Sequence, residues 1–306
     1  MKEKKPLVSV IMNCYNGEEF LQRAIDSVCA QTYKELEIIF WDNASTDRSA
    51  EIYMETAKND TRFKYFRSEK NVTLGEARAL AVEKCTGEYI AFLDTDDEWL
   101  PNKTEIQIKA MLKDDYVLSY SSVYEVYDDK YRTYDIRWKS GHIFANLLTQ
   151  FEIQLVAAMI KRETLVEKGL NFDPFIQASE EYCLFMQLIY DEKVCVIDQP
   201  LAKYYIRKDS LTQKSIDRWA IERRYTLDKI CKEHPDHEKY SDEFKEAYAR
   251  GDYYEAEYLV SVGNIKEARS VLAKTVSVSY KYFLLYCLLY LPVGLWNKIH
   301  LLKYKR

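Results

Sequence analysis

Four short apolar runs in the first hundred residues alternate with amphipathic segments, and this alternation constrains the fold more than any other feature of the sequence. Between the runs, apolar residues recur at spacings of three and four, as on one face of an α-helix. The predicted strands are residues 7–13, 35–41, 63–68 and 89–93, and the predicted helices between them begin near residues 20, 50 and 74. Strands joined by helices are typical of βαβ units. We therefore predict an α/β fold with a mostly parallel sheet flanked by helices.

The rest of the chain divides into a less regular middle and a helical end. A strand is expected at residues 116–126, and helices are expected at residues 102–112 and 180–190. From about Trp219 onward the pattern is helical throughout. We therefore predict two domains, residues 1–215 and residues 216–306, of which the second is a C-terminal helical extension.

The charge balance argues against one class of partner. The 306 residues include 44 Lys and Arg against 49 Asp and Glu, a net charge of −5. Such a chain has no overall basic field to hold a phosphate backbone, so we expect no nucleic acid partner. The N-terminus lacks the apolar stretch and cleavage site of a signal peptide, and the seven cysteines include no CxxC pair. We expect a cytoplasmic protein with reduced thiols.

Acidic side chains follow two of the predicted strands. Asp42 comes directly after one strand, and the sequence LDTDD, which holds Asp94, Asp96 and Asp97, ends another. The carboxyl ends of parallel strands lie at one edge of a sheet, where ligands bind. Gathered carboxylates repel one another unless a cation lies among them, and oxygen ligands favour Mg²⁺ or Mn²⁺, which a phosphate can share. The alternative is that Asp94, Asp96, Asp97 and Glu98 cap the following helix, which Pro101 would open, and face solvent.

Three ordered segments extend this interpretation. They read VSVIMNCYNGEEFLQRAIDSVCAQTYKELEIIFWDNASTD, then NVTLGEARALAVEKCTGEYIAFLDTDDEWLP, then, more weakly, ASEEYCLFMQL, and they span roughly residues 7–188. Together they make the chain resemble glycosyltransferase family 2, whose members are inverting sugar transferases with a GT-A fold. The resemblance implies a GT-A type catalytic domain over residues 1–215 that binds a nucleotide-sugar.

The resemblance also implies roles for individual residues. Asp42 would contact the uracil of a UDP-sugar, and Tyr15, in the turn after the first strand, would stack on the base. Arg78 would reach the nucleotide or its diphosphate, Asp94 would contact the ribose side, and Asp96 would bind Mg²⁺ or Mn²⁺. Two of these residues also have ordinary interpretations, Tyr15 as a core aromatic residue and Arg78 as an arginine on a helix surface.

Inverting transfer needs a base. A carboxylate must take the proton of the acceptor hydroxyl on the side of the sugar ring opposite the leaving group. The family usually supplies it as the Asp of a Glu-Asp pair that opens a helix, and the resemblance matches that Asp to Glu181 in SEEYCLF. Because the Glu side chain is longer, Glu180 remains a rival base. A helix N-terminus also attracts two glutamates through its dipole alone.

Arg207 marks a departure from the family pattern. Many members carry a His in a YRxH pattern that reaches the metal or the diphosphate, whereas this chain has YYIRKDSLT. An arginine cannot ligate Mg²⁺ or Mn²⁺ but can clamp phosphate oxygens. We therefore expect weak metal affinity, and a plain basic surface turn is the alternative interpretation.

The resemblance implies transfer of a sugar from a nucleotide donor, with UDP expected, to a hydroxyl of a glycan or lipid-linked acceptor in bacterial surface polysaccharide synthesis. One alternative is a catalytically inactive nucleotide-binding scaffold, although the acids and the glutamates that such a scaffold would lose are present. A second alternative is a sugar-1-phosphate nucleotidyltransferase. That class needs a Gly-rich loop with a basic residue after the first strand, whereas NCYNGEE has one glycine and two acids.

The C-terminal region combines a predicted helical hairpin, which turns at Gly263 and Asn264, with an uncharged stretch at residues 282–296. These 15 residues are too few to span a bilayer, which needs about 20. Residues 280–306 carry five cations and no acids. We expect them to make peripheral contact with the inner face of the cytoplasmic membrane. The alternative is a terminal helix pair packed on the protein.

Overall fold

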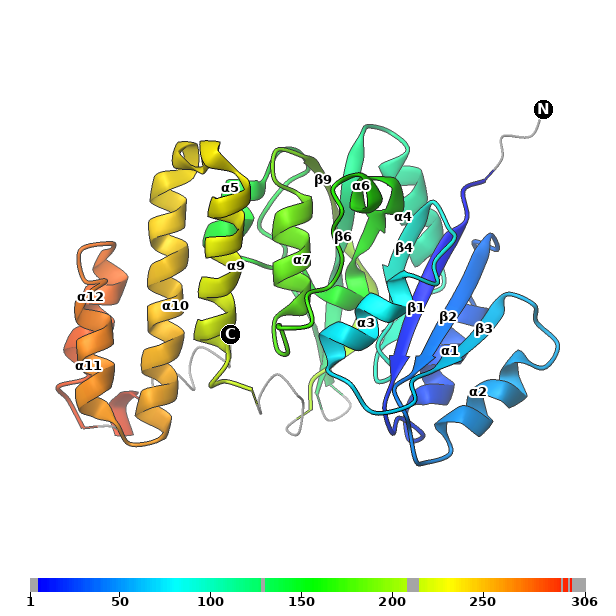
Figure 1. The fold of residues 1–306 in the computed structure, drawn as a ribbon, viewed down its shortest axis with the longest axis horizontal. Coiled ribbons are helices and arrows are strands. Elements are labelled where there is room, and N and C mark those ends of the chain that lie inside the picture. The colour runs from blue at the N-terminus through cyan, green and yellow to red at the C-terminus, as the bar shows by residue number, and fades with distance from the viewer. Residues whose placement is uncertain (1–4, 128–129, 208–214, 293, 297, 299–306) are drawn as a thin grey trace. The chain divides into compact units, whose positions relative to one another are not determined.

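The computed structural model describes residues 5–127, 130–207, 215–292, 294–296 and 298. The chain forms two compact units (Figure 1). The first comprises residues 1–147 and 151–208, and the second comprises residues 148–150 and 209–306. The predicted division into functional domains at residues 215 and 216 stays a prediction.

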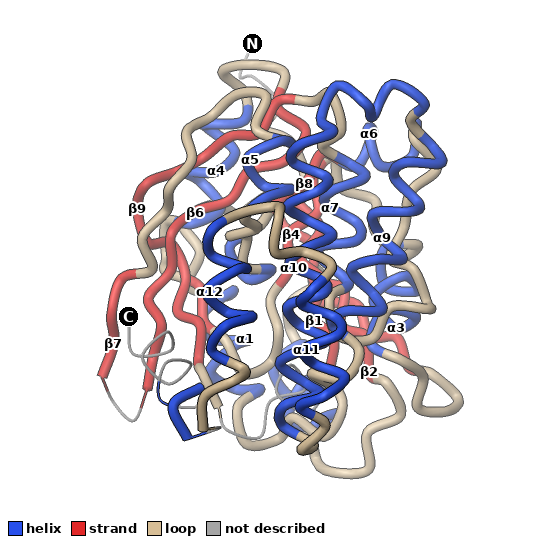
Figure 2. The backbone as a smooth tube through the Cα atoms, turned by 90° about the vertical axis from the view of Figure 1, so that its left-hand side faces the viewer, coloured by secondary structure: helices blue, strands red, loops and turns tan. Residues whose placement is uncertain are grey.

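The first unit is built on one sheet, which has nine strands in the described residues. Its order is β3-β2-β1-β4-β8-β6-β9-β5, with β7 paired to β6 (Figure 2). The strands are β1 (Val8–Cys14), β2 (Leu36–Asp42), β3 (Phe63–Arg67), β4 (Tyr89–Phe92), β5 (Glu98–Trp99), β6 (Tyr116–Tyr127), β7 (Lys130–Thr133), β8 (Met159–Lys161) and β9 (Lys193–Tyr205). β1 pairs in parallel with β2 and β4, and β2 pairs in parallel with β3. The predicted α/β class is confirmed.

Helices cover both faces of the parallel strands. Val8, Val10 and Met12 point to one face and join the main hydrophobic core with α1 (Leu21–Cys29), and Tyr53 of α2 (Ser49–Ala57) joins the same core. The chain then reverses its direction across the sheet, because β3 lies at an edge whereas β4 lies beside β1. Since crossovers are right-handed, this reversal places α3 (Leu74–Val82) on the opposite face, in front of β1 in Figure 1.

The same reversal defines where a ligand fits. β1 and β4 are neighbours in the sheet although two other strands lie between them in the chain, and ligands of open α/β sheets bind at the carboxyl ends of strands where the strand order reverses in this way. Tyr15 follows β1, Asp42 ends β2, and Asp94 follows β4 closely. The topology therefore brings these three predicted site residues to one edge of the sheet.

Glu37 is a buried acid inside β2, and it fixes the turn that precedes β4. Its carboxylate accepts hydrogen bonds from Ser9 Oγ (2.5 Å) and Thr86 N (2.6 Å). It also accepts from Gly87 N (3.1 Å) and pairs with Lys64 Nζ (2.5 Å). Burial alone would raise the pKa of Glu37, but these hydrogen bonds outweigh burial and lower it to about 2. The Glu37 carboxylate thereby connects the turn before β4 to β1, β2 and β3.

The middle of the first unit contains both predicted and unpredicted elements. The predicted strand at residues 116–126 is β6, and the predicted helix at residues 180–190 is α7 (Glu180–Leu188). β8 and β5 pair antiparallel with β4 and β9. They were not predicted, because strands of two or three residues show no periodicity. The other helices here are α4 (Lys103–Met111), α5 (Phe144–Thr149), the 3₁₀ helix η1 (Leu155–Ala157) and α6 (Arg162–Glu167).

The second unit is helical, as predicted. Its elements are α9 (Trp219–Glu233), the 3₁₀ helix η2 (Pro235–Tyr240), α10 (Ser241–Ser261), α11 (Ile265–Ala273) and α12 (Tyr280–Leu288). The predicted hairpin turns at Gly263, whose φ of 83° is readily adopted by glycine, and Asn264 caps α11 by accepting from Glu267 N. None of the helices in the described residues combines the length and the apolar composition that a membrane crossing requires.

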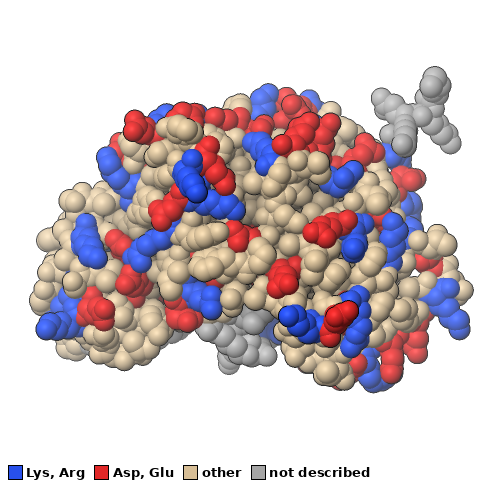
Figure 3. All heavy atoms as spheres, in the orientation of Figure 1, with Lys and Arg blue, Asp and Glu red and all other residues tan. Residues whose placement is uncertain are grey.

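Surface charges of both signs are mixed. On the face drawn in Figure 3, Lys and Arg side chains lie interspersed with Asp and Glu side chains, without an extended area of one sign. This distribution accords with a net charge close to neutrality for a chain of 306 residues. On this face there is no basic tract of the kind that holds a nucleic acid backbone.

Candidate active site

The acidic loop after β4 is fixed by its own backbone and by β9. Asp97 N donates to Asp94 O (3.1 Å), which closes a turn, and Tyr205 N donates to Asp97 Oδ1 (3.0 Å). Asp97 is buried, and this burial, together with the charges of Asp96 and Asp94, raises its pKa well above the usual range. Asp97 therefore supports the loop, whereas Asp94 and Asp96 are half-buried and remain accessible.

The alternative in which these acids cap the next helix is wrong. α4 begins at Lys103, its N-cap residue is Asn102, and no side chain caps it. Glu98 lies instead in β5 and forms an ion pair with Lys203 of β9 (2.9 Å). The acidic loop is thus held between β4 and β9, and its carboxylates are available for a ligand.

Arg78, on α3, connects the acidic loop to α7. Only 4% of its surface is exposed, so the alternative of a helix-surface arginine is wrong. Its Nη2 lies 3.0 Å from both carboxylate oxygens of Asp94, and its Nη1 lies 3.7 Å from Glu180 Oε1. Burial alone would lower the pKa of this guanidinium, but the carboxylates of Asp94, Glu180 and Glu181 raise it. The side chain therefore stays cationic.

A glycine allows α3 to approach the segment that leads into α7. A Cβ atom on Gly75 would lie 2.7 Å from Ile176 O and 2.8 Å from Asp173 O, closer than carbon atoms approach backbone oxygen. It would also lie 3.5 Å from Glu180 Cγ. The absence of a side chain at Gly75 thereby lets Arg78 and Glu180 meet.

The two glutamates that open α7 have different surroundings. Glu180 is buried and faces Arg78, whereas Glu181 is half-buried. Burial, and then the charge of Glu180, raises the pKa of Glu181 to about 7, although Arg78 opposes the shift. Attraction to the helix N-terminus alone would lower this pKa. A carboxylate whose pKa lies near neutral pH is suited to general base catalysis.

Asp96 lies among basic and aromatic side chains. Arg207 Nε lies 3.6 Å from Asp96 Oδ2, and Arg23 Nη2 donates to Asp96 O (2.6 Å). The Arg207 guanidinium lies 4.6 Å from the Phe20 ring centroid, and that of Arg23 lies 3.6 Å from the Tyr205 ring centroid. Arg207 therefore belongs to an organised cluster, and the residues that follow it, 208–214, lie outside the described residues.

Arg23 was not predicted as a site residue. It lies on α1 between the buried residues Leu21 and Ala24, where a helix that faces the sheet carries apolar side chains. The sequence feature that could have pointed to Arg23 as a site residue is a long charged side chain beside the apolar face of a helix. The signal is weak, because such side chains usually extend into solvent.

The carboxylates fit a divalent cation that is held in part by a ligand. Burial and the charge of Asp94 raise the pKa of Asp96, and a bound cation would favour the ionised form. In the part of the chain that the structure describes, no three His, Cys, Asp or Glu side chains are grouped to hold a metal by themselves. Mg²⁺ typically takes only one or two carboxylates together with substrate phosphates. Asp96 can supply one such carboxylate, with Asp94 two residues away in the same loop.

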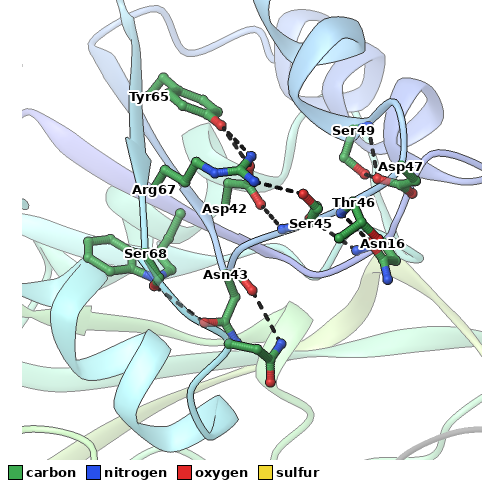
Figure 4. Close-up of polar contacts among 12 residues, drawn as sticks. Asn16, Asp42, Asn43, Ser45, Thr46, Asp47, Ser49, Tyr65, Arg67 and Ser68 are labelled. Atoms are coloured by element: carbon green, nitrogen blue, oxygen red, sulfur yellow. Dashed lines mark hydrogen bonds and ion pairs between the residues drawn. The ribbon is translucent and has the colours of Figure 1, made fainter.

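Asp42 ends β2 and has no exposed surface. Its Oδ1 accepts from Ser45 N (2.7 Å), and its Oδ2 accepts from Tyr65 Oη (2.6 Å) and from Arg67 Nη1 (2.6 Å) (Figure 4). Tyr65 and Arg67, which were not predicted, lie two residues apart on β3 and therefore point to the same face. The spacing of Tyr65 and Arg67 points to Asp42 only once β3 is known to pair with β2.

Tyr15 is 55% exposed, so its alternative interpretation as a core residue is wrong. The next residue, Asn16, has a φ of 51° and ties the turn after β1 to the loop after β2. Its backbone N donates to Ser45 Oγ (3.1 Å), and its Oδ1 accepts from Thr46 N (2.8 Å) (Figure 4). An exposed aromatic ring on a fixed turn is suited to stacking on a planar ligand.

The predicted site residues thus form two groups at one edge of the sheet. The first group consists of charged residues that lie close to one another: Arg78, Asp94, Glu180, Glu181, Asp96 and Arg207. The second consists of Asp42 and Tyr15, which are joined through Ser45 and Asn16. The first group can hold charged groups and accept a proton, and the second group presents an aromatic ring.

Sequence comparisons match the chain to one family model, Glycosyl transferase family 2, over residues 9–163. The chain is 32% identical over 216 residues to an uncharacterized glycosyltransferase of Rickettsia felis, with 70% of this chain and 35% of that protein covered. It is 30% identical over 210 residues to the Escherichia coli UDP-Glc:alpha-D-GlcNAc-diphosphoundecaprenol beta-1,3-glucosyltransferase WfgD, with 69% and 79% covered. The chain therefore spans about a third of the length of its Rickettsia relatives.

Solved structures share the fold. The structure of S. aureus TarS 1–349 in complex with UDP-GlcNAc matches with a TM-score of 0.72 and 16% identity, over 89% of this chain and 81% of that one. The mannosyltransferase PcManGT from Pyrobaculum calidifontis, in complex with GDP-Man and Mn²⁺, matches with a TM-score of 0.63 and 16% identity, over 97% and 84%. At these identities the likeness concerns the fold alone.

Proposed function

The chain belongs to glycosyltransferase family 2, and on this premise we propose that it transfers a sugar from a UDP-sugar donor to a hydroxyl group of a glycan or lipid-linked acceptor. Its α/β fold is of the GT-A type. The proposal includes inversion at the anomeric carbon and a role in bacterial surface polysaccharide synthesis. The name of the relative WfgD includes both a UDP-Glc donor and an acceptor linked to diphosphoundecaprenol, which supports this choice of substrates.

The observation that carries the proposal is the environment of Glu181. It combines accessibility with a pKa of about 7, so near neutral pH a large share of the side chains is ionised and able to accept a proton. It lies one residue from Glu180, which contacts the Arg78 guanidinium that also holds Asp94. Transfer from a nucleotide-sugar requires a proton acceptor for the acceptor hydroxyl, and here that proton acceptor lies beside the fixed ion pair of Arg78 and Asp94.

In the proposed reaction the Glu181 carboxylate takes the proton of the acceptor hydroxyl. The hydroxyl oxygen then attacks the anomeric carbon, and the bond from that carbon to the diphosphate oxygen breaks with its electron pair leaving on UDP. Attack from the side opposite the leaving group inverts the configuration. Arg78 keeps Asp94 and Glu180 in place, Asp94 contacts the ribose, and Arg207 binds diphosphate oxygens as their charge grows.

Asp96, with Asp94 beside it, would hold a divalent cation, Mg²⁺ or Mn²⁺, and such a cation supplies positive charge to the leaving diphosphate. Arg207 already lies 3.6 Å from the Asp96 carboxylate. A guanidinium at this position supplies part of the same charge, so we expect metal affinity to be weak without a nucleotide. Mn²⁺ in the PcManGT complex supports the use of a metal by proteins of this fold.

The proposal also includes peripheral contact with the inner face of the cytoplasmic membrane through residues 280–306. On α12 and the residues that follow it, Tyr280, Phe283, Leu284 and Leu291 are exposed. Apolar residues of this kind, next to cations, suit the interface of a bilayer that contains anionic lipids. A lipid-linked acceptor would be present at the same surface.

A donor screen tests the proposed function. Purified protein is titrated with UDP, GDP and dTDP in the presence of MnCl₂, and each corresponding sugar nucleotide is then incubated with GlcNAc-diphosphoundecaprenol as an acceptor probe. We expect tightest binding of UDP and release of UDP that depends on the acceptor. No binding of any nucleoside diphosphate would overturn the proposal, and binding without turnover on any acceptor tried would favour the inactive scaffold.

A substitution in the metal site sharpens this test. Asp96→Asn should abolish transfer and remove the effect of MnCl₂ on UDP affinity, because the carboxylate proposed to hold the cation is lost. Asp114→Asn is the matched control, since Asp114 is a surface acid paired with Lys193. Unchanged metal dependence in the Asp96 variant would exclude Asp96 from the metal site.

A further inference from the structure

The peptide unit between Asp96 and Asp97 is held from both sides. Its N–H group, which belongs to Asp97, donates to Asp94 O (3.1 Å) and closes the turn of the acidic loop. Its carbonyl group, which belongs to Asp96, accepts from Arg23 Nη2 (2.6 Å). In a trans peptide these two groups point in opposite directions, so a rotation of this peptide would break both hydrogen bonds. The backbone at Asp96, and with it the direction of its side chain, is therefore fixed.

Arg23 also contacts the residue of β9 that supports the acidic loop. The Arg23 guanidinium lies 3.6 Å from the centroid of the Tyr205 ring, and the backbone N of Tyr205 donates to Asp97 Oδ1 (3.0 Å). A guanidinium can make both of its contacts at once, because its donors lie in the plane of the group while its face stacks on an aromatic ring. Arg23, the peptide of Asp96 and Asp97, and Tyr205 thus form a closed ring of contacts that joins α1, the acidic loop and β9.

Arg23 differs from Arg207 in the part of the acidic loop that it binds. Arg207 lies beside the Asp96 carboxylate, whereas Arg23 donates to the Asp96 backbone oxygen. Burial and the neighbouring acids raise the pKa of Asp97, and the charge of Arg23 acts in the opposite direction. Arg23 therefore brings positive charge to the acidic loop and leaves the Asp96 carboxylate to a ligand.

We propose that Arg23 is a positioning residue, which acts through the backbone of Asp96 to direct the Asp96 carboxylate toward a divalent cation that the donor diphosphate shares. The inference rests on the proposed function, because it assumes a UDP-sugar donor and a cation at Asp96. Residues that hold a metal ligand in place without touching the metal commonly change metal affinity by about 10–100-fold when they are replaced. Arg23 should therefore set the cation concentration at which nucleotide binding is strengthened.

Calorimetric titration of UDP at a series of MnCl₂ concentrations tests the inference. Arg23→Met removes the donor and the charge but keeps a long side chain beside the Tyr205 ring. The MnCl₂ concentration that gives half of the gain in UDP affinity should rise by about tenfold, at the lower end of the range for supporting residues. UDP affinity without MnCl₂ should stay the same, because Arg23 does not touch the nucleotide in this proposal.

Arg23→Lys decides the matter if Arg23→Met does not fold. Lysine keeps the charge and a donor, but it lacks the planar group that reaches Asp96 O while it stacks on Tyr205. The MnCl₂ requirement of this variant should therefore rise, by less than tenfold, and a requirement equal to that of the wild type would overturn the inference. Arg62→Met is the matched control, since Arg62 pairs with Asp60 just before β3 begins, and it should change neither UDP affinity nor the MnCl₂ requirement.

The remaining outcomes separate the inference from the proposed function. Equal loss of UDP affinity with and without MnCl₂ in Arg23→Met would show a direct contact with the nucleotide and would overturn the inference alone. A lower thermal unfolding midpoint with an unchanged MnCl₂ requirement would show a purely structural role and would overturn it as well. A wild-type protein that binds no UDP, or whose UDP affinity does not respond to MnCl₂, would overturn the proposed donor or the proposed metal site, and this inference with it.

Discussion

At the scale of single residues, the surroundings of a side chain decide its role more than its type does. Glu180 and Glu181 are adjacent residues of the same type. Glu180 is buried against Arg78, whereas Glu181 is half-buried and has a pKa of about 7. The sequence alone left open which of them is the base. The contrast in burial and charge favours Glu181, while Glu180 serves to hold Arg78.

Glu181→Gln should lower the rate of transfer by roughly 10²–10⁴-fold, the usual contribution of a general base, and leave UDP binding intact. In the wild type, kcat/KM should rise with pH through about 7, because the base is active only when ionised and its raised pKa keeps it protonated at lower pH. Initial rates of UDP release across this pH range, together with calorimetric titration of UDP, measure both effects.

Two controls accompany the pH profile. Glu163→Gln alters an acid with an exposed side chain and should change neither the rate nor the profile. Glu180→Gln should lower the rate less than Glu181→Gln does. A larger effect at Glu180, or a wild-type rate that does not vary near pH 7, would remove Glu181 from the role of base.

At the scale of elements, the site depends on close approach between helices that are far apart in the chain. α3 and the segment before α7 meet where Gly75 leaves room for the carbonyl oxygens of Asp173 and Ile176. The contact brings Arg78 and Glu180 together across 102 residues of sequence. The arrangement of the charges proposed to act in catalysis therefore requires a small residue at position 75, which has no proposed role in the reaction itself.

Gly75→Ala should lower the free energy of unfolding by about 1–3 kcal/mol, the usual cost of overpacking. It should also lower the rate of transfer on the order of 10²-fold, since displacing a reacting group by about 1 Å has an effect of this size. Thermal unfolding and initial rates measure the two quantities. The physical reason is that the new Cβ atom must push the segment before α7 away from α3.

Gly251→Ala is the matched control, because Gly251 lies in the interior of α10 and a Cβ atom there has no neighbour closer than 3.8 Å. Alanine is the better helix former, so this variant should gain roughly 0.5–1 kcal/mol of stability and keep its activity. If Gly75→Ala behaves like Gly251→Ala, the close approach of α3 does not position Glu181.

At the scale of the whole molecule, charge and apolar surface are unevenly distributed along the chain. Residues 280–306 carry a charge of +5, so the rest of the chain carries −10. Tyr282, Leu289 and Trp296 are buried in a cluster with α10 and α11, and Tyr282 Oη donates to Glu246 Oε1 (2.8 Å). α12 thus packs in its own unit through one face and exposes apolar residues elsewhere.

The combined substitution Phe283→Ser, Leu284→Ser and Leu291→Ser should release the protein from vesicles that contain phosphatidylglycerol. These residues are 46%, 44% and 47% exposed, so their loss leaves the buried cluster intact. Truncation after Thr275 would remove the buried residues as well and would unfold the cluster. Flotation of the full chain with vesicles measures binding, and raising the salt concentration should weaken it.

A control variant and a second vesicle composition complete the flotation assay. Ile221→Ser with Val262→Ser removes exposed apolar residues elsewhere in the second unit and should leave binding unchanged. Vesicles of phosphatidylcholine alone should bind the wild type more weakly, because they lack the anionic headgroups that attract lysine. Wild-type protein that does not float with anionic vesicles at low salt would exclude this surface as a membrane contact.

The fold class, the family and the location of the acids along the chain could be predicted from the sequence alone. Each follows from local information: apolar runs separated by helical periodicity specify βαβ units, and the carboxyl ends of parallel strands meet at one edge whatever the details of packing. Asp42 and Asp94 could therefore be expected near a common site before any contact was known. The prediction of the family is confirmed, and so is the GT-A type of the fold.

Which of these side chains are accessible and which are buried could be seen only in the folded chain. The burial of Arg78 depends on α7, the burial of Asp42 depends on β3, and the contact of Arg23 with the acidic loop spans 73 residues. The burial and the pKa of a side chain are set by neighbours that are distant in sequence. The periodicity of the sequence indicates only the face on which a residue lies, and it does not show what covers that face. The distinction between Glu180 and Glu181 therefore required the folded chain.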